Sequence, residues 1–127
     1  PGEPFQEKAV RLKEDHVSGV IELSSLGFVI QEVANTFWRA TKLNRISAAD
    51  AKEALKALND IRIEVHELDW AQTAQVLDIA CDLNLTIYDA SYIFLAKETK
   101  APLITADQTL YETARKWFKI LHVKDYV

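Results

Sequence analysis

The feature that most constrains the fold of this 127-residue chain is a repeated switch between two hydrophobic spacings. Segments with apolar residues three and four positions apart, the spacing of an amphipathic helix, alternate with short apolar runs that are typical of strands. Helices that alternate with short strands favour an α/β fold with a largely parallel sheet. The few glycines and prolines, three of each, and the absence of a linker indicate one ordered domain over residues 1–127.

The same spacings predict where each element lies. Helices are expected over residues 4–15, 26–43, 47–61, 70–83, 88–99 and 108–118, and strands over residues 20–23, 62–68, 101–105 and 119–123. Ser24 or Ser25 is expected to cap the second helix, and Asp69 the fourth. The helix over residues 88–99 is apolar nearly all round, so we expect it to be buried.

Charge and cysteine content limit the class of function. The net charge of −4 does not favour a general electrostatic attraction to nucleic acid, so a partner with phosphates needs local basic residues or a bridging cation. The single cysteine, Cys81, rules out a disulfide framework and is expected to be a buried hydrophobe in a reducing cytoplasm. No apolar run reaches the ~18 residues of a membrane span, so no membrane partner is expected. The three histidines, His16, His66 and His122, are interpreted as surface or strand-end residues.

Two aspartates stand beside the most apolar part of the chain. Asp89 opens the helix over residues 88–99, and Asp107 lies between the strand over residues 101–105 and the next helix. A buried carboxylate without a partner costs roughly several kcal/mol, so these two residues either cap helices or converge on something positive. For each aspartate taken alone, capping is the favoured interpretation.

The capping interpretation is weaker for Asp107, because its helix has other possible caps. Thr105 with Gln108, and Thr109 with Glu112, both have the spacing of a capping box. In open α/β sheets, ligands also gather outside the carboxyl ends of strands, which is where Asp107 is expected.

Glu32 is the third candidate acid. On a helical wheel it lies with Asn35, Thr36 and Arg39, away from the apolar stripe, which favours a solvated helix face. Arg39 is placed to pair with Glu32 or to meet a phosphate. Several carboxylates that meet at one end of a sheet repel each other and become stable around a hard divalent cation. Such a cation lowers the pKa of a bound water and neutralises the transition state of phosphodiester hydrolysis.

Three segments, QEVANTFWRA (31–40), YDASYIFLA (88–96) and LITADQTL (103–110), follow one another in an order and at a spacing that resemble the PIN-domain family. The likeness is to its VapC-like toxin ribonucleases, and it extends over nearly the whole chain. The first segment resembles the family's Glu-bearing helix, and the other two resemble the segments around its third and fourth acidic residues.

The resemblance implies a PIN-like three-layer α/β/α sandwich with a mainly parallel sheet. It implies that Glu32, Asp89 and Asp107 are metal-site acids and that Thr105 is a polar residue supporting the site. The implied activity is Mg²⁺- or Mn²⁺-dependent endonucleolytic hydrolysis of RNA by an activated water. The implied partners are RNA, a cognate antitoxin and a second copy of the chain in a homodimer.

Basic residues near the end of the Glu-bearing helix are the candidates for substrate binding. Arg39, Lys42 and Arg45 lie there, although charged residues on a helix are usually just solvated. We single out Arg39 and Lys42 as the candidate substrate contacts.

The chain departs from the family pattern at its start. The family begins with a central strand that ends in an essential Asp, whereas this chain starts at PGEPFQEKA, and Asp15 closes a helix before Gly19. Without that strand the edges of its neighbours would be unpaired, and the site would keep three of its four acids. We therefore expect an N-terminally incomplete PIN-like domain that is inactive as given and derives from an active ribonuclease.

Two alternatives to this enzyme remain open. The first is a catalytically inactive PIN-fold module that binds a protein partner or RNA. The second is an unrelated α/β domain in which Asp89 and Asp107 are only helix caps.

Overall fold

The computed structural model describes residues 5–127, in which helices alternate with short strands as the sequence predicts. The helices are α1 (Gln6–Val17), α2 (Val29–Lys42), α3 (Ala48–Asp60), α4 (Trp70–Leu83), α5 (Ile87–Thr99) and α6 (Gln108–Ala114), with a 3-10 turn, η1 (Val123–Asp125). The strands are β1 (Ser24–Leu26), β2 (Glu64–His66), β3 (Leu103–Thr105) and β4 (Ile120–His122). The expected start of the first helix, at residue 4, lies outside the described residues.

The chain divides into two compact units. The first, called here the α2 unit, is Glu22–Glu67 and contains β1, α2, α3 and β2. The second, called here the α5 unit, joins Pro1–Ile21 to Leu68–Val127 and contains the remaining elements.

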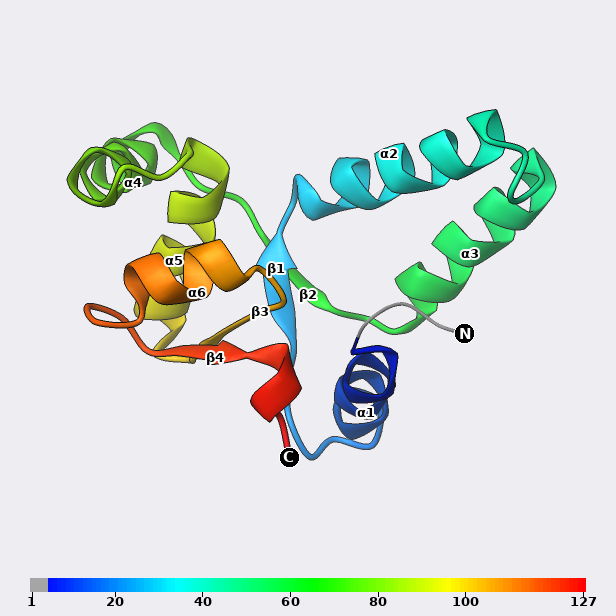
Figure 1. The fold of residues 1–127 in the computed structure, drawn as a ribbon, viewed down its shortest axis with the longest axis horizontal. Coiled ribbons are helices and arrows are strands. Elements are labelled where there is room, and N and C mark those ends of the chain that lie inside the picture. The colour runs from blue at the N-terminus through cyan, green and yellow to red at the C-terminus, as the bar shows by residue number, and fades with distance from the viewer. Residues whose placement is uncertain (1–4) are drawn as a thin grey trace. The chain divides into compact units, whose positions relative to one another are not determined.

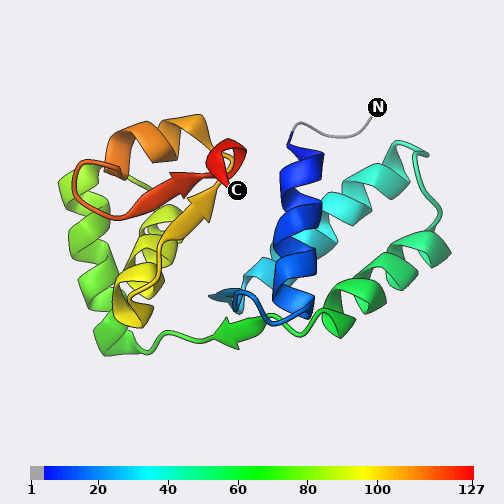
Figure 2. The same ribbon diagram turned by 90° about the horizontal axis from the view of Figure 1, so that it is seen from below.

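In the α2 unit, β1 and β2 pair in parallel, and α2 and α3 form the connection between them (Figure 2). β1 begins at Ser24, four residues later than expected, so the predictions of a strand over residues 20–23 and of a serine cap are wrong. The reason is that pairing with β2 continues to Gly27, whose N–H donates to the His66 carbonyl at 3.0 Å. The chain turns there, and Phe28 precedes α2 without a side-chain cap.

In the α5 unit, β3 and β4 also pair in parallel, with Leu103 opposite Ile120 and Thr105 opposite His122. α5 and α6 contact these strands, and α4 packs against α5 (Figure 1). The parallel pairing in both units confirms the predicted sheet type. Within residues 5–127 each strand has one strand neighbour, so each sheet has two strands.

The core of the α5 unit is built on α5, as its uniform hydrophobicity predicts. Ala90, Ile93 and Phe94 are each at most 2% exposed. One face of α5 packs on α4 through Phe94 and Val76, and another packs on α6 through Ile93 and Leu110. Burying each such large apolar side chain stabilises the fold by about 1.5–3 kcal/mol.

The ends of α4 match the sequence closely, while Cys81 and the end of α6 do not. Asp69 caps α4 with a reciprocal capping box, since its Oδ1 accepts from the Gln72 N–H at 2.7 Å. Cys81 is exposed, so the prediction that it is buried is wrong. The buried face of α4 carries Val76 and Ala80 instead. α6 ends at Ala114 rather than at residue 118, where the chain tightens into a turn.

α1 is tied to the C-terminal turn by polar contacts within the α5 unit. Tyr126 donates its hydroxyl proton to Asp15 Oδ2 at 2.5 Å, and Lys8 Nζ donates to the Tyr126 carbonyl. Gly19, at φ 85°, lies just beyond the end of α1 in the left-handed conformation that glycine adopts readily.

Across residues 5–127, the structure contains no helix that is both long and apolar enough to cross a membrane.

We predict that Ile93→Ala lowers the free energy of unfolding by about 2–5 kcal/mol, because Ile93 is 1% exposed between α5 and α6. Urea denaturation followed by circular dichroism measures the change. Leu77→Ala is the control, since Leu77 is 53% exposed on α4 and its truncation is expected to cost less than about 1 kcal/mol. Equal losses for the two variants would mean that α5 is not the core of this unit.

We predict that Tyr126 stabilises the fold below pH ~10 and loses this effect at higher pH. The hydrogen bond from Tyr126 to the Asp15 carboxylate raises the tyrosine pKa above its ordinary value of 10.0. A raised pKa means that folding favours the neutral phenol, so the contribution is complete below the unfolded pKa and disappears as pH rises through the folded pKa. The difference in Tm between the parent protein and Tyr126→Phe should therefore shrink above pH ~10. A difference that stays constant into that range would contradict the contact.

Candidate active site

Asp89 lies in the first turn of α5 and does not cap the helix. The cap is Thr86, whose Oγ1 accepts from the Asp89 N–H at 3.2 Å. The capping interpretation of Asp89 is therefore wrong. Its side chain is half-buried beside Ala90, which is fully buried, and the helix dipole favours a negative charge at this end.

Asp107 follows β3 and is the N-cap of α6, as the capping interpretation predicts. Its Oδ1 accepts from the Leu110 N–H at 3.0 Å. Thr105 is not the cap: its Oγ1 accepts from the Asp107 N–H at 3.0 Å and holds the turn between β3 and α6. The Gln108 and Glu112 side chains bond to each other at 2.7 Å, with Gln108 as the donor. Neither alternative capping box, Thr105 with Gln108 or Thr109 with Glu112, caps the helix, because the N-cap is Asp107.

The capping role uses only one oxygen of the Asp107 carboxylate. Within residues 5–127, Oδ2 of Asp107 makes no hydrogen bond or ion pair, and the residue is exposed. Asp107 can therefore cap α6 and offer an oxygen to a ligand at the same time.

Asp89 and Asp107 lie at the same end of α5 and β3. From Asp89 to Lys100 the helix rises about 16 Å at 1.5 Å per residue. β3 then runs back along α5, and the five residues 101–105 can cover a similar length at up to about 3.3 Å each (Figure 2). The start of α5 and the end of β3 therefore meet at one edge of the α5 unit, which is the carboxyl edge of its sheet.

Glu32 lies in the first turn of α2 and is exposed, in the α2 unit rather than the α5 unit. Arg39 and Lys42, both exposed, lie in the last turn of the same helix, and Lys42 Nζ lies 4.8 Å from the centre of the Trp38 ring. In the described part of the chain Arg39 makes no ion pair, so the predicted Glu32–Arg39 pair does not form.

The structure brings two of the three predicted acids to one edge. Among the side chains of residues 5–127, no three His, Cys, Asp or Glu residues are grouped to hold a metal ion. Asp89 and Asp107 share the α5 unit, and the convergence of Glu32 with them stays a prediction. Their oxygen-only chemistry suits Mg²⁺ or Mn²⁺, which prefer carboxylates and water as ligands.

His122 is a core residue that the sequence interpretation placed only at a strand end. It ends β4 opposite Thr105, is 2% exposed, and accepts from the Lys124 N–H through Nδ1 at 3.1 Å. The rings of Phe5 and Tyr111 meet it edge to face at 5.1 and 5.8 Å. The apolar run ILHV around it is the sequence signal for this burial.

The sequence profile of the PIN domain matches residues 2–116. The chain belongs to the PIN-domain family. This membership confirms the resemblance seen in the three sequence segments and rules out an unrelated α/β domain. The crystal structure of PAE2754 from Pyrobaculum aerophilum superposes with a TM-score of 0.74 at 25% identity, covering 94% of this chain and 83% of that one. The PIN-like α/β fold is thus confirmed.

Curated relatives of this PIN-domain chain carry nuclease names. It is 32% identical over 105 residues to ribonuclease VapC3 of Pyrobaculum aerophilum, covering 78% of the chain and 76% of the relative. It is 31% identical over 90 residues to exonuclease VapC9 of that organism, and the match covers 70% of the chain. It is also 30% identical over 87 residues to ribonuclease VapC9 of Mycobacterium tuberculosis, over 68% of the chain. These matches span 65% and 66% of the lengths of the two VapC9 proteins.

We predict that Asp107→Ala destabilises the protein by about 1 kcal/mol, because it removes the cap of α6, whereas Asp107→Asn leaves stability nearly unchanged. Asn caps a helix as well as Asp does, so the second variant removes the charge alone. Thr86→Ala should cost a similar ~1 kcal/mol at α5. Urea denaturation of the three variants checks this, and equal stability of Asp107→Ala and Asp107→Asn would exclude the capping role.

Proposed function

We propose that this PIN-domain protein is a divalent-metal-dependent endoribonuclease that hydrolyses RNA phosphodiesters, as the toxin of a toxin–antitoxin pair. The observation that carries the proposal is the placement of Asp89 and Asp107 at one edge of the α5 unit. The similarity to proteins named VapC ribonuclease supports it.

In this proposal Asp89, Asp107 and Glu32 hold Mg²⁺ or Mn²⁺ through carboxylate oxygens. When bound, such an ion supplies a water of lowered pKa and positive charge for the phosphate. Asp107 is oriented by its own capping bond, which uses Oδ1 and leaves Oδ2 available to a ligand. Thr105 is a positioning residue, because its hydroxyl fixes the Asp107 backbone.

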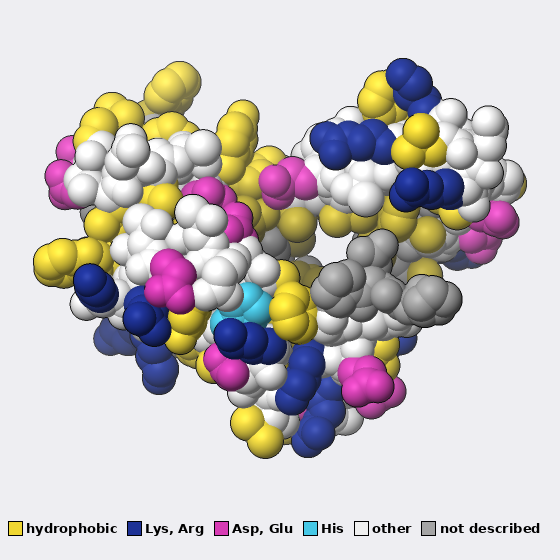
Figure 3. All heavy atoms as spheres, in the orientation of Figure 1, with side chains coloured by type: hydrophobic (Ala, Val, Ile, Leu, Met, Phe, Trp, Pro, Cys, Tyr) yellow, Lys and Arg dark blue, Asp and Glu magenta, His cyan; other side chains and the backbone are white. Residues whose placement is uncertain are grey.

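Basic side chains on α2 are the proposed contacts to the RNA backbone. Arg39, Lys42 and Arg45 are exposed, and Lys and Arg side chains gather over this helix and the turn after it in Figure 3. Arg39 lies two turns from Glu32, on the same side of the helix. In a protein with a net charge of −4, such a local cluster supplies the positive charge that a polyanion requires.

The proposed partners are a protein antitoxin and a second copy of the chain, in the cytoplasm. Support comes from the likeness to VapC proteins. Large apolar side chains on α2, including Ile30 and Trp38, are more than half exposed and offer surface for such contacts.

A catalytically inactive PIN module that binds RNA or a protein is the second candidate. It is favoured by one observation, the exposure of the large apolar side chains Ile30 and Trp38 on α2, which suits a binding surface that needs no metal. A cleavage assay with matched variants separates this candidate from the enzyme.

We predict that Asp89→Asn and Asp107→Asn each lower RNA cleavage more than about 100-fold in the complete gene product, because each removes a charged oxygen ligand. Cleavage of single-stranded RNA in Mg²⁺ or Mn²⁺, with and without chelator, measures this. Glu98→Gln is the control, since Glu98 is an exposed acid near the other end of α5, about 14 Å from Asp89 along the helix axis. Chelator-resistant cleavage, or equal rates in all three variants, would refute the metal-nuclease assignment.

A further inference from the structure

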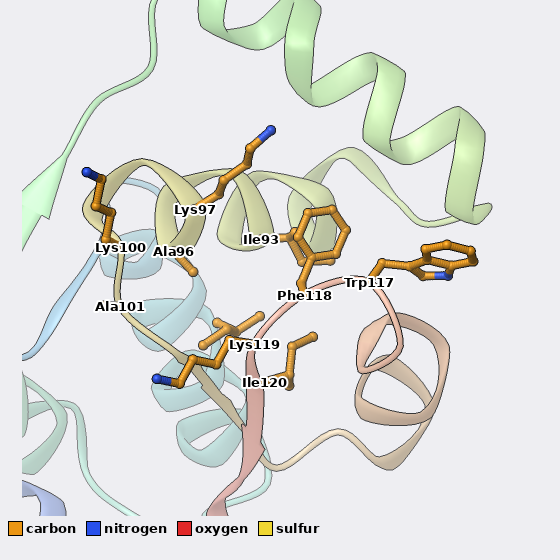
Figure 4. A pocket seen from close by; sticks show the side chains of 10 residues that line it. Ile93, Ala96, Lys97, Lys100, Ala101, Trp117, Phe118, Lys119 and Ile120 are labelled. Atoms are coloured by element: carbon orange, nitrogen blue, oxygen red, sulfur yellow. The ribbon is translucent and has the colours of Figure 1, made fainter.

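A hollow of about 460 Å³ lies at the opposite end of α5 from Asp89. Its floor is apolar and is formed by side chains of α5, β3 and the segment leading into β4 (Figure 4). Ile93, Leu103, Phe118 and Ile120 make this floor, and all four belong to the packed core between α5, α6 and the sheet. The floor is therefore held in place by the core of the α5 unit.

The rim of the hollow is positively charged. Lys97 and Lys100 come from the end of α5, Lys119 precedes β4, and no Asp or Glu lines the hollow. Lys100 and Lys119 point to the same side in Figure 4. Within the described chain none of the three lysines makes an ion pair. In a protein of net charge −4, three unneutralised cations around one hollow favour an anionic ligand.

An exposed indole lies at the other end of the hollow. Trp117 follows α6, is 71% exposed, and lies across the hollow from Lys100 and Lys119 (Figure 4). Its neighbour Phe118 turns into the core, which anchors the backbone of Trp117. An exposed aromatic face beside lysines is the combination that binds single-stranded nucleic acid, with bases stacked on rings and phosphates on cations.

We propose that this hollow is an accessory binding site for single-stranded RNA. A base stacks on Trp117 above the apolar floor, and the flanking phosphates meet Lys97, Lys100 and Lys119. The proposal takes from the proposed function only the choice of RNA as the nucleic acid. An acidic peptide is the less favoured ligand. One of its apolar side chains could pack on the floor of the hollow, but the exposed face of Trp117 would then have no partner.

The accessory site is separate from the carboxylate edge. Lys97 lies about 12 Å and Lys100 about 16 Å from Asp89 along the axis of α5. Because α5 is buried and rigidly packed, this separation is fixed. RNA bound in the hollow therefore contributes affinity without contact to the acids.

The test is RNA binding in chelator by the complete gene product carrying Asp107→Asn, measured by fluorescence anisotropy of a labelled single strand of about 12 nucleotides. Adding Trp117→Ala should weaken binding about tenfold, and Trp117→Phe should retain most of it. Replacing Lys100 and Lys119 with Gln should lower the slope of log affinity against log salt by about 1.4, at about 0.7 per phosphate contact.

Matched controls separate this site from general surface effects. Trp70→Ala removes another exposed indole, 93% exposed at the start of α4, and Lys13→Gln with Lys52→Gln removes the same charge from α1 and α3. Equal affinity of Trp117→Ala and Trp70→Ala, or an unchanged salt slope in the Lys100/Lys119 variant, would overturn the accessory site. Binding of an acidic Leu/Glu peptide that is lost in Trp117→Ala while RNA binding is unaffected would overturn the choice of RNA.

The two proposals fail in different experiments. Metal-dependent cleavage that is unchanged by Asp107→Asn would refute the proposed nuclease site, and it would not bear on RNA binding at Trp117. RNA binding that is unchanged by Trp117→Ala would refute the accessory site, and it would not bear on the proposed nuclease site.

Discussion

The burial of α5 is the constraint on which the α5 unit depends. Phe94 and Ile93 lie on different faces of this helix, and each packs into a separate part of the core. α4, α6 and the β3–β4 pair are all positioned by contact with it or with its neighbours. A helix packed on several sides has one position, so the side chains at its two ends are fixed relative to each other. Asp89 stands at one end and the Lys97–Lys100 rim at the other.

Local rules of sequence predicted much of this unit. The Asp69 capping box, the burial of α5, the parallel pairing and the cap at Asp107 are all present in the structure. The prediction was wrong where one local signal competed with another. Thr86, not Asp89, caps α5. A Thr three residues before an acidic residue has the spacing of a capping box, in which the Thr is the cap and the acid lies inside the first turn.

Other features depend on tertiary contacts that a single segment does not encode. Ser24 and Ser25 fit a helix cap locally, but pairing with β2 draws them into β1. The pattern over residues 108–118 continues as a helix, yet the chain leaves α6 at Ala114 and turns Phe118 into the core. In that turn Trp117 is exposed, and it lines the lysine-rimmed hollow.

In the proposed metal site, Asp107 combines a structural role with a chemical one. Asp107 caps α6 with Oδ1 and presents Oδ2, so its position is set by the fold before any ligand binds. Glu32 was recognised through family resemblance alone, since its helical face has the polarity of an ordinary solvated surface. This chain shares the PIN-like fold with PAE2754, whereas the proposed chemistry depends on these few side chains.

Calorimetric titration of Mn²⁺ into the complete gene product and into its Asp107→Asn variant tests the proposed metal site most directly. The variant keeps the helix cap and loses only the charge, so a change in binding reports on the metal ligand rather than on folding. A carboxylate metal site at Asp107 predicts a saturable binding isotherm for the parent protein and none for the variant at equal thermal stability. Identical isotherms for the two proteins would show that Asp107 is a helix cap alone and would contradict the carboxylate metal site.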